Sequence, residues 1–232
     1  MTKQRRTQAP LAAPEEPPLP MRAPAALAIA LVVIALTVAA GVGLNWAAQA
    51  KRPPEFANCH LATQLAPGRF AGPPAMCIDA KKDYSAVLST SKGDIQLTFS
   101  KSAPITVNNF IVLAVNGYFN GQHFFAVQDW IVQAGDPQAN GSGGPGYTLP
   151  PEPLGKDEHL TPGAMGMARF PDGSLSGSQY FILRGPWPGS EPTTVYNRFA
   201  TVSGAGLSVV SQLDASDRIT QIKIESSQPK KT

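Results

Sequence analysis

Apolar side chains recur at every second position in two neighbouring segments near the middle of the chain. They do so over residues 84–88 and again over 95–99, on either side of a polar turn at 91–94. Because successive residues of a strand point to opposite faces, a period of two buries one face of each strand. The pattern predicts an antiparallel hairpin with one buried face.

A helical period follows this hairpin. Apolar residues stand at positions 107, 110, 111 and 114, which is the spacing of one helix face. We expect Ser102 to cap the helix and Pro104 to lie in its first turn, where its missing N–H costs little. The pair Asn116-Gly117 predicts the end of the helix.

Shorter apolar runs complete the predicted domain, which we place at residues 84–226, with a tail over 227–232. We expect strands over 124–132 (interrupted at 128–129), 165–168, 179–183 and 219–224, a short helix over 207–213, and a long Gly- and Pro-rich surface loop over 137–163. The predicted class is mainly β, an antiparallel barrel capped by two helices.

A different pattern precedes this domain. Residues 23–44 carry no charged side chain, and these 22 residues at ~1.5 Å each can cross a bilayer core of ~30 Å. We expect one transmembrane helix there, with Trp46 at the membrane interface. Lys and Arg are more numerous before this segment than directly after it. The Pro-rich residues 1–22 are therefore predicted to be a disordered cytoplasmic tail, and the main domain extracytoplasmic.

A cleaved signal peptide is the alternative, because Ala48-Gln49-Ala50 fits an A-x-A cleavage site. Both interpretations export the remainder of the chain. The net charge of +3 comes largely from the basic residues before the apolar run, which leaves the main domain nearly neutral. No basic patch with interleaved aromatic residues is present, so nucleic acid is not an expected partner.

Residues 45–83 are rich in Pro and Ala without sustained periodicity, and we expect an extracytoplasmic tether there. This segment contains both cysteines of the chain, Cys59 and Cys77. In an oxidising compartment the simplest expectation is that they pair, which would contribute ~3 kcal/mol in the loop-entropy model. Two unpaired thiols are the alternative. His60 adjoins Cys59, but no other ligand pair has metal-site spacing, so no metal is expected.

Several short motifs, in order, resemble those of the cyclophilins, the barrel-shaped peptidyl-prolyl isomerases. The resemblance covers residues 84–226. Its pieces are KGDI at 92–95, APITVNNF at 103–110, GYFNG at 117–121, QAGDP at 133–137, GSGGPGY at 141–147, GMAR at 166–169 and GSQYFI at 177–182. Each fragment alone is weak evidence, but seven in the family's order are not accidental.

The resemblance implies a cyclophilin-like barrel and a groove that binds proline-containing polypeptides without a cofactor. It implies catalytic or peptide-holding roles for Gln133, Ala168 and Gln179. The expected substrate-binding residues are Trp130, Ile131, Phe181, Tyr196 and Trp187, of which Trp187 lies in a loop that is longer than the family's usual one. From pattern alone, Trp130 and Phe181 would be core residues and the two glutamines surface amides; the ordered motifs favour a groove instead.

One expected residue is missing. The family places an arginine shortly after the GYFNG turn, and it donates a hydrogen bond toward the prolyl nitrogen as the amide twists. This chain has Phe125 or Ala126 at that position, depending on where a one-residue gap falls, and neither can donate. Arg169 or Arg198, each beside a groove residue, is a hypothetical replacement.

The sequence therefore predicts a membrane-anchored, extracytoplasmic peptidyl-prolyl cis-trans isomerase of reduced activity. The alternative is a non-catalytic module or chaperone that holds proline-containing segments in a degenerate groove. A purely structural envelope domain would neither bind nor turn over such peptides.

Overall fold

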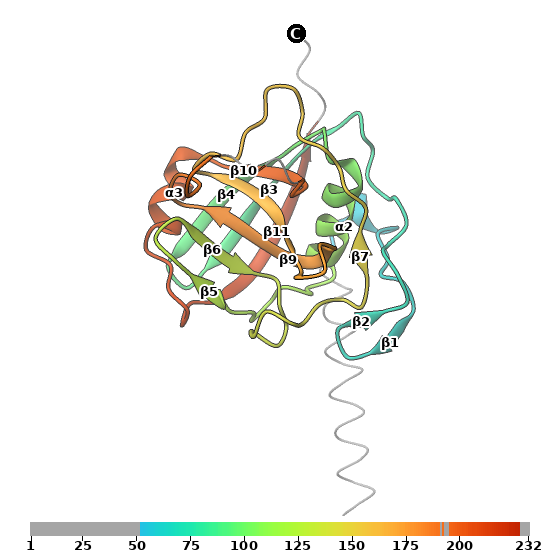
Figure 1. Ribbon diagram of the computed structural model, residues 1–232. Coiled ribbons are helices and arrows are strands. Elements are labelled where there is room, and N and C mark those ends of the chain that lie inside the picture. The colour runs from blue at the N-terminus through green and yellow to red at the C-terminus, as the bar shows by residue number, and fades with distance from the viewer. Residues whose placement is uncertain (1–51, 191, 193–194, 228–232) are drawn as a thin grey trace, which may run out of the picture. The chain divides into compact units, whose positions relative to one another are not determined.

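The computed structural model describes residues 52–190, 192 and 195–227 (Figure 1). The predicted cytoplasmic tail, transmembrane helix and C-terminal tail fall outside these residues, apart from residue 227 at the end of the last strand. Within them, no helix is long and apolar enough to cross a membrane.

One curled antiparallel sheet with two helices forms the domain. Its strand order is β11-β3-β4-β10-β8-β9-β6-β5, and β7 pairs with β9. The elements are β3 (Asp83–Thr90), β4 (Gly93–Phe99), α2 (Pro104–Val115), β5 (Ala126–Val127), β6 (Ile131–Ala134), β7 (Thr148–Leu149), β8 (Ala164–Arg169), β9 (Leu175–Leu183), β10 (Arg198–Val202), α3 (Gly204–Val210) and β11 (Ile219–Ser227).

The sheet curls so far that the segments next to its two edge strands meet. An isolated backbone bridge joins His123, before β5, to Arg218, before β11. The result is a half-barrel with α2 at one end and α3 at the other, as Figure 1 shows. The predicted hairpin is confirmed as β3 and β4, with alternating burial in both strands. The mainly β class and the two helices are confirmed as well.

The core lies between α2 and the sheet. Phe110 from α2 packs its ring against those of Phe119, Phe199 and Tyr180, with centroids 4.9, 5.1 and 5.5 Å away. All four rings are at most 1% exposed. Burial of such aromatic side chains gives ~1.5–3 kcal/mol each, so this cluster is a large part of the stability.

The start of α2 differs from the prediction. Ala103, not Ser102, is the N-cap residue, and it has no side-chain cap. The buried Glu152 from the long loop accepts hydrogen bonds from the N–H groups of Ile105 and Thr106 at 2.9 and 2.8 Å instead. A carboxylate at a helix N-terminus satisfies free donors and complements the helix dipole. A residue 47 positions away does the capping, so a local pattern could not reveal it.

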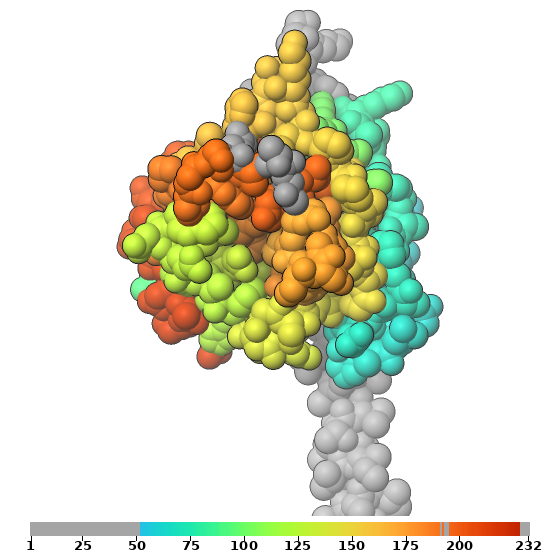
Figure 2. Space-filling view, viewed as in Figure 1, coloured from blue at the N-terminus to red at the C-terminus, as the bar shows by residue number. Residues whose placement is uncertain are grey.

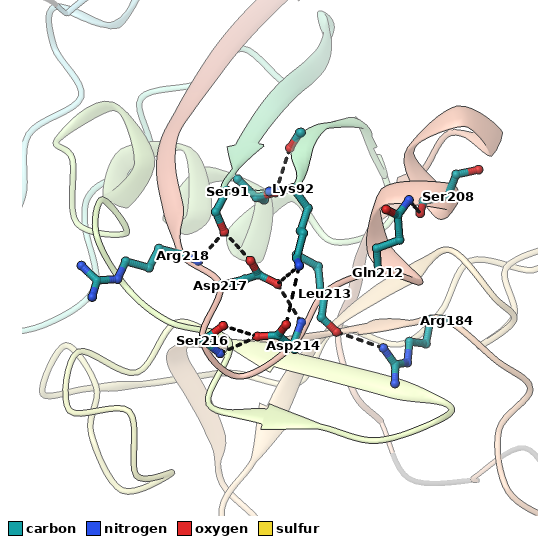
Figure 3. Close-up of polar contacts among 12 residues, drawn as sticks. Ser91, Lys92, Arg184, Ser208, Gln212, Leu213, Asp214, Ser216, Asp217 and Arg218 are labelled. Atoms are coloured by element: carbon teal, nitrogen blue, oxygen red, sulfur yellow. Dashed lines mark hydrogen bonds and ion pairs between the residues drawn. The ribbon is translucent and has the colours of Figure 1, made fainter.

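The β3–β4 turn is tied to the turn before β11 (Figure 3). Ser91 Oγ donates to the buried Asp217 at 2.5 Å, and Lys92 Nζ lies 3.6 and 3.8 Å from the carboxylates of Asp214 and Asp217. Asp214 and Asp217 follow the α3 region, so this network fixes the connection into the edge strand β11.

Residues 52–83 do more than link. They contain the short helix η1 (Pro54–Phe56) and a small hairpin, β1 (Gln64–Ala66) and β2 (Arg69–Phe70). Phe56, Cys59 and Phe70 are buried in the main core. Apolar residues of a segment without sustained periodicity thus still contribute to the main core. The disulfide between Cys59 and Cys77 is present, as predicted.

Candidate functional site

A groove of about 270 Å³ runs across the sheet where β5, β6, β8 and β9 meet. Figure 2 shows this face hollowed between the green β5–β6 region, the yellow-green loop after residue 137 and the orange segments on either side of residue 180. All eight predicted site residues line it: Trp130, Ile131, Gln133, Ala168, Gln179, Phe181, Tyr196 and Trp187. The structure therefore brings together every residue that the resemblance indicated.

Strand register explains why Gln133 and Phe181 share the groove. They stand directly opposite one another in the antiparallel β6–β9 pair, and opposite residues point to the same face. Phe181 is 1% exposed and forms the floor, whereas Gln133 is half-buried. The Gln133 side chain makes no hydrogen bond to any residue within the described ranges, so its amide is available to the backbone of a bound peptide.

An aromatic wall stands over the floor. The Trp187 ring lies 5.1 Å from Trp130, 6.1 Å from Phe181 and 5.3 Å from Tyr196, measured between centroids. These rings belong to a second apolar cluster, which also contains Ile131 and is separate from the main core. Trp187 therefore lies beside the other groove residues, although it belongs to a loop that is longer than the family's usual one.

Small residues behind the wall set the depth of the groove. Gly166 on β8 lies under Phe181, and a Cβ there would come within 2.6 Å of the Phe181 ring. Ala168, two positions along the same strand, reaches the groove with only 8% of its surface exposed. Gly166 therefore allows the close approach of β8 to Phe181.

Gln179 has a structural task in addition to lining the groove. Its Nε2 donates to the carbonyl oxygens of Gly141 and Gly143 at 3.0 and 2.6 Å. The buried carboxylate of Asp136 holds the same loop, because it accepts hydrogen bonds from the N–H groups of Gln138, Asn140, Gly141 and Gly143. Gln179 thus fixes the glycine-rich rim of the groove.

The two candidate replacement arginines differ in position. Arg198 is directed elsewhere, because it donates to Glu158 at 2.8 Å and to Thr201 at 2.7 Å and does not line the groove. Arg169 does line the groove, and its Nη1 donates to the carbonyl oxygen of Val195 at 2.7 Å. Of the two, only Arg169 lines the groove.

Strand register favours Ala126 over Phe125 as the position of the family arginine. Ala126 is paired with Gln133, so both Cβ atoms lie on the same face of the sheet, although the residues that line the groove include Phe125 and not Ala126. Phe125 lines the groove from the residue before β5 and points toward Gly141. The position opposite Gln133 therefore carries a methyl group where a donor would be useful.

The groove walls include residues that the sequence did not indicate. Phe170 and Pro171, from the turn after β8, also line the groove. Their position two and three residues after Ala168 was the available signal, since the residues that follow a groove-lining strand lie at the edge of the groove. Two tyrosines behind the glycine-rich loop, Tyr118 and Tyr147, have raised pKa values because they are buried, that of Tyr118 to about 12. Both are therefore neutral hydrogen-bonding groups.

Comparisons with known proteins agree with this geometry. Residues 85–230 match the family model for cyclophilin type peptidyl-prolyl cis-trans isomerase/CLD. A peptidyl-prolyl cis-trans isomerase of Synechococcus elongatus is 38% identical over 142 residues, 60% of this chain and 94% of that one. Peptidyl-prolyl cis-trans isomerase B of Bacillus subtilis is 32% identical over 146 residues, which cover 62% of this chain and 99% of that one.

A solved structure shows the same fold. The crystal structure of a cyclophilin type peptidyl-prolyl cis-trans isomerase from Cryptosporidium parvum has a TM-score of 0.55, at 22% identity, and covers 62% of this chain and 99% of that one. The same protein has been solved in the presence of the dipeptide Ala-Pro. By sequence and by fold, this chain belongs to the family of cyclophilin-type peptidyl-prolyl cis-trans isomerases.

Proposed function

We propose that this isomerase acts on X–Pro bonds of extracytoplasmic proteins, is held at the membrane by a helix over residues 23–44, and works more slowly than members that carry the family arginine. The observation behind the reduced rate is the pairing of Ala126 with Gln133 on the groove-facing side of the sheet. That behind the substrate is the apolar floor and aromatic wall around Phe181.

The groove suits rotation about a prolyl bond. The planar amide opposes rotation with a barrier of ~18–20 kcal/mol because of its conjugation. Phe181, Ile131 and Trp130 provide a dry seat for the proline ring, and the Gln133 amide can hold the neighbouring backbone. A site that holds both ends while the amide twists lowers the barrier only as far as it binds the twisted state more tightly than the planar states.

The missing donor limits this gain. As the amide loses conjugation, the prolyl nitrogen becomes a hydrogen-bond acceptor, and a charged donor there stabilises the transition state alone. Removal of one such preorganised donor costs on the order of 10²–10³ in rate in other enzymes. The groove keeps its apolar seat, so peptide affinity falls much less than turnover.

The second candidate function follows from the same observation. With a methyl group opposite Gln133, the groove could hold proline-containing segments without useful turnover, as a binding module or chaperone does. The two candidates differ in turnover and agree in binding.

A protease-coupled isomerisation assay on the full-length chain in detergent distinguishes them. We expect the wild type to isomerise the peptide faster than the uncatalysed rate. The catalysed rate should fall at least tenfold in Phe181→Ala and in Gln133→Ala. Gln133→Glu is the variant of matched size. Binding of Pro-containing peptides, read from the fluorescence of Trp130 and Trp187, accompanies each assay. Binding without any turnover would establish the second candidate and overturn the first.

The membrane location has its own support and its own test. The uncharged run over 23–44 is long enough to span a bilayer, and the Cys59–Cys77 disulfide suits an oxidising compartment. We expect the intact chain in the membrane fraction. Protease added on the extracytoplasmic side of the membrane should have access to residues 52–227. A shortened chain released into the soluble fraction, beginning after Ala50, would indicate a cleaved signal peptide instead.

A further inference from the structure

A second cavity of about 180 Å³ adjoins the groove. The two share Phe170 as a wall, and the glycine-rich loop borders both, with Gly141 on the groove side and Ser142, Gly143 and Gly144 on the other. Cavities for whole small molecules measure ~300–1,000 Å³, so this one suits a single side chain of a peptide that already occupies the groove.

The far wall of this cavity comes from outside the segment that matches the family. Arg69, on β2 of the small hairpin, lines it, whereas the family match begins at residue 85. The hairpin is fixed in place there: the N–H of Phe70 donates to the carbonyl oxygen of Pro145 at 2.7 Å, and the Phe70 ring lies 6.2 Å from that of Tyr118. The disulfide closes the loop that contains this hairpin.

Arg69 is the only charged residue among those that line the cavity in the described part of the chain. Its side chain is exposed and makes no ion pair or hydrogen bond with the residues that the structure describes. The other lining groups are glycines, the Ser142 and Thr148 hydroxyls and two aromatic rings. An unpaired guanidinium beside hydroxyl groups and open backbone attracts a carboxylate.

A peptide with its proline ring on Phe181 and its preceding residue at Ala168 would continue past Arg169 to Phe170, because these two residues follow Ala168 at the end of β8 and line the same groove. An extended peptide advances ~3.3 Å per residue, so the residue two or three positions before proline reaches the Phe170 wall.

We propose that Arg69 is a specificity-determining residue, through which the hairpin selects substrates with Asp or Glu two or three positions before the proline. This inference rests on the proposed function, because it places the substrate in the groove. The hairpin thus adds the guanidinium of Arg69 at the cavity, apart from that of Arg169, which lines the groove and donates to the carbonyl oxygen of Val195.

The test compares peptides that carry Asp, Ala or Lys at these two positions, in the full-length protein, by both kcat/KM and Kd. We expect a preference of about two- to fivefold for Asp over Lys at low salt, as for an exposed ion pair, and its decline as the ionic strength rises. Arg69→Glu should invert the Asp-to-Lys ratio. Arg218→Glu is the matched control, since Arg218 is also exposed and lies outside both cavities, and its ratio should equal that of the wild type.

An Asp placed after the proline should give no preference. Equal ratios in wild type and Arg69→Glu would overturn the assignment while the isomerase function stands. If no peptide is turned over, the proposed function fails, and the Kd ratio still decides the role of Arg69.

Discussion

At the scale of single residues, the groove combines an apolar floor and an aromatic wall with a methyl group at the position paired with Gln133. Phe181 and Gln133 face one another across β6 and β9, and the aromatic rings of Trp130, Trp187 and Tyr196 enclose them. The side chain opposite Gln133 on the other neighbouring strand is a methyl group, that of Ala126. Under the proposed function, this is the position at which an arginine would supply the charged donor for the prolyl nitrogen.

This predicts a gain of function. Ala126→Arg places a guanidinium on the groove side of β5, and we expect kcat/KM in the protease-coupled assay to rise by on the order of 10². Ala126→Met is the control of similar length without a donor and should not raise the rate. An equal rise in both variants, or none in Ala126→Arg, would contradict the position that the strand register gives to the missing arginine.

At the scale of elements, long loops are fixed by buried and half-buried carboxylates. Glu152 caps α2, Asp136 holds the glycine-rich loop, and Glu158 joins the 155–158 loop to β10 and to the residues before α2. Desolvation alone would raise the pKa of Glu158, but hydrogen bonds from Ser100, Ser102 and the Gly155 N–H, with the charge of Arg198, outweigh it and hold that pKa below its ordinary value.

A lowered carboxyl pKa makes stability depend on pH in a known direction. The stabilisation by Glu158 is fully present above the ordinary carboxyl pKa of ~4.5 and is lost as the pH falls through the lower folded-state pKa. We expect Glu158→Gln to reduce the free energy of unfolding at pH 7 by ~1–2 kcal/mol and to lose less stability than the wild type between pH 5 and pH 2. Urea denaturation at each pH measures both.

The neighbouring Asp157 supplies the control. Asp157 is exposed and makes no side-chain hydrogen bond or ion pair with the residues that the structure describes, so Asp157→Asn should leave the denaturation curves near those of the wild type. If the free energy of unfolding of the wild type and of Glu158→Gln falls in parallel on acidification, the contacts of Glu158 do not lower its pKa.

At the scale of the whole molecule, the described chain is a half-barrel with an added N-terminal segment that is stapled to it. Phe56 and Phe70 extend the main core, and the Cys59–Cys77 disulfide closes the loop within this segment that contains Phe70. The stapled hairpin in turn contacts the glycine-rich loop through Phe70 and Pro145. Stability and the shape of the groove rim are therefore connected.

Removal of the disulfide should show this connection. We expect Cys59→Ala/Cys77→Ala to lower the free energy of unfolding by ~3 kcal/mol, because the closed loop spans a sequence separation of 18 residues. Wild type in reductant should show the same loss, and the double variant should not respond to reductant. A double variant as stable as the oxidised wild type would mean that the buried contacts of Phe56 and Phe70 alone hold the segment.

The sequence by itself determined the elements with a strong period and the family. Alternation predicted β3 and β4, a helical period predicted α2, and the resemblance to the cyclophilins indicated the eight residues that line the groove, four of them within the ordered motifs. The long-range partners were decided by the tertiary structure. Glu152 rather than Ser102 at α2, Ala126 opposite Gln133, Arg198 turned toward Glu158, and Arg69 beside the groove all join segments distant in sequence, and only strand register and loop packing bring such residues together.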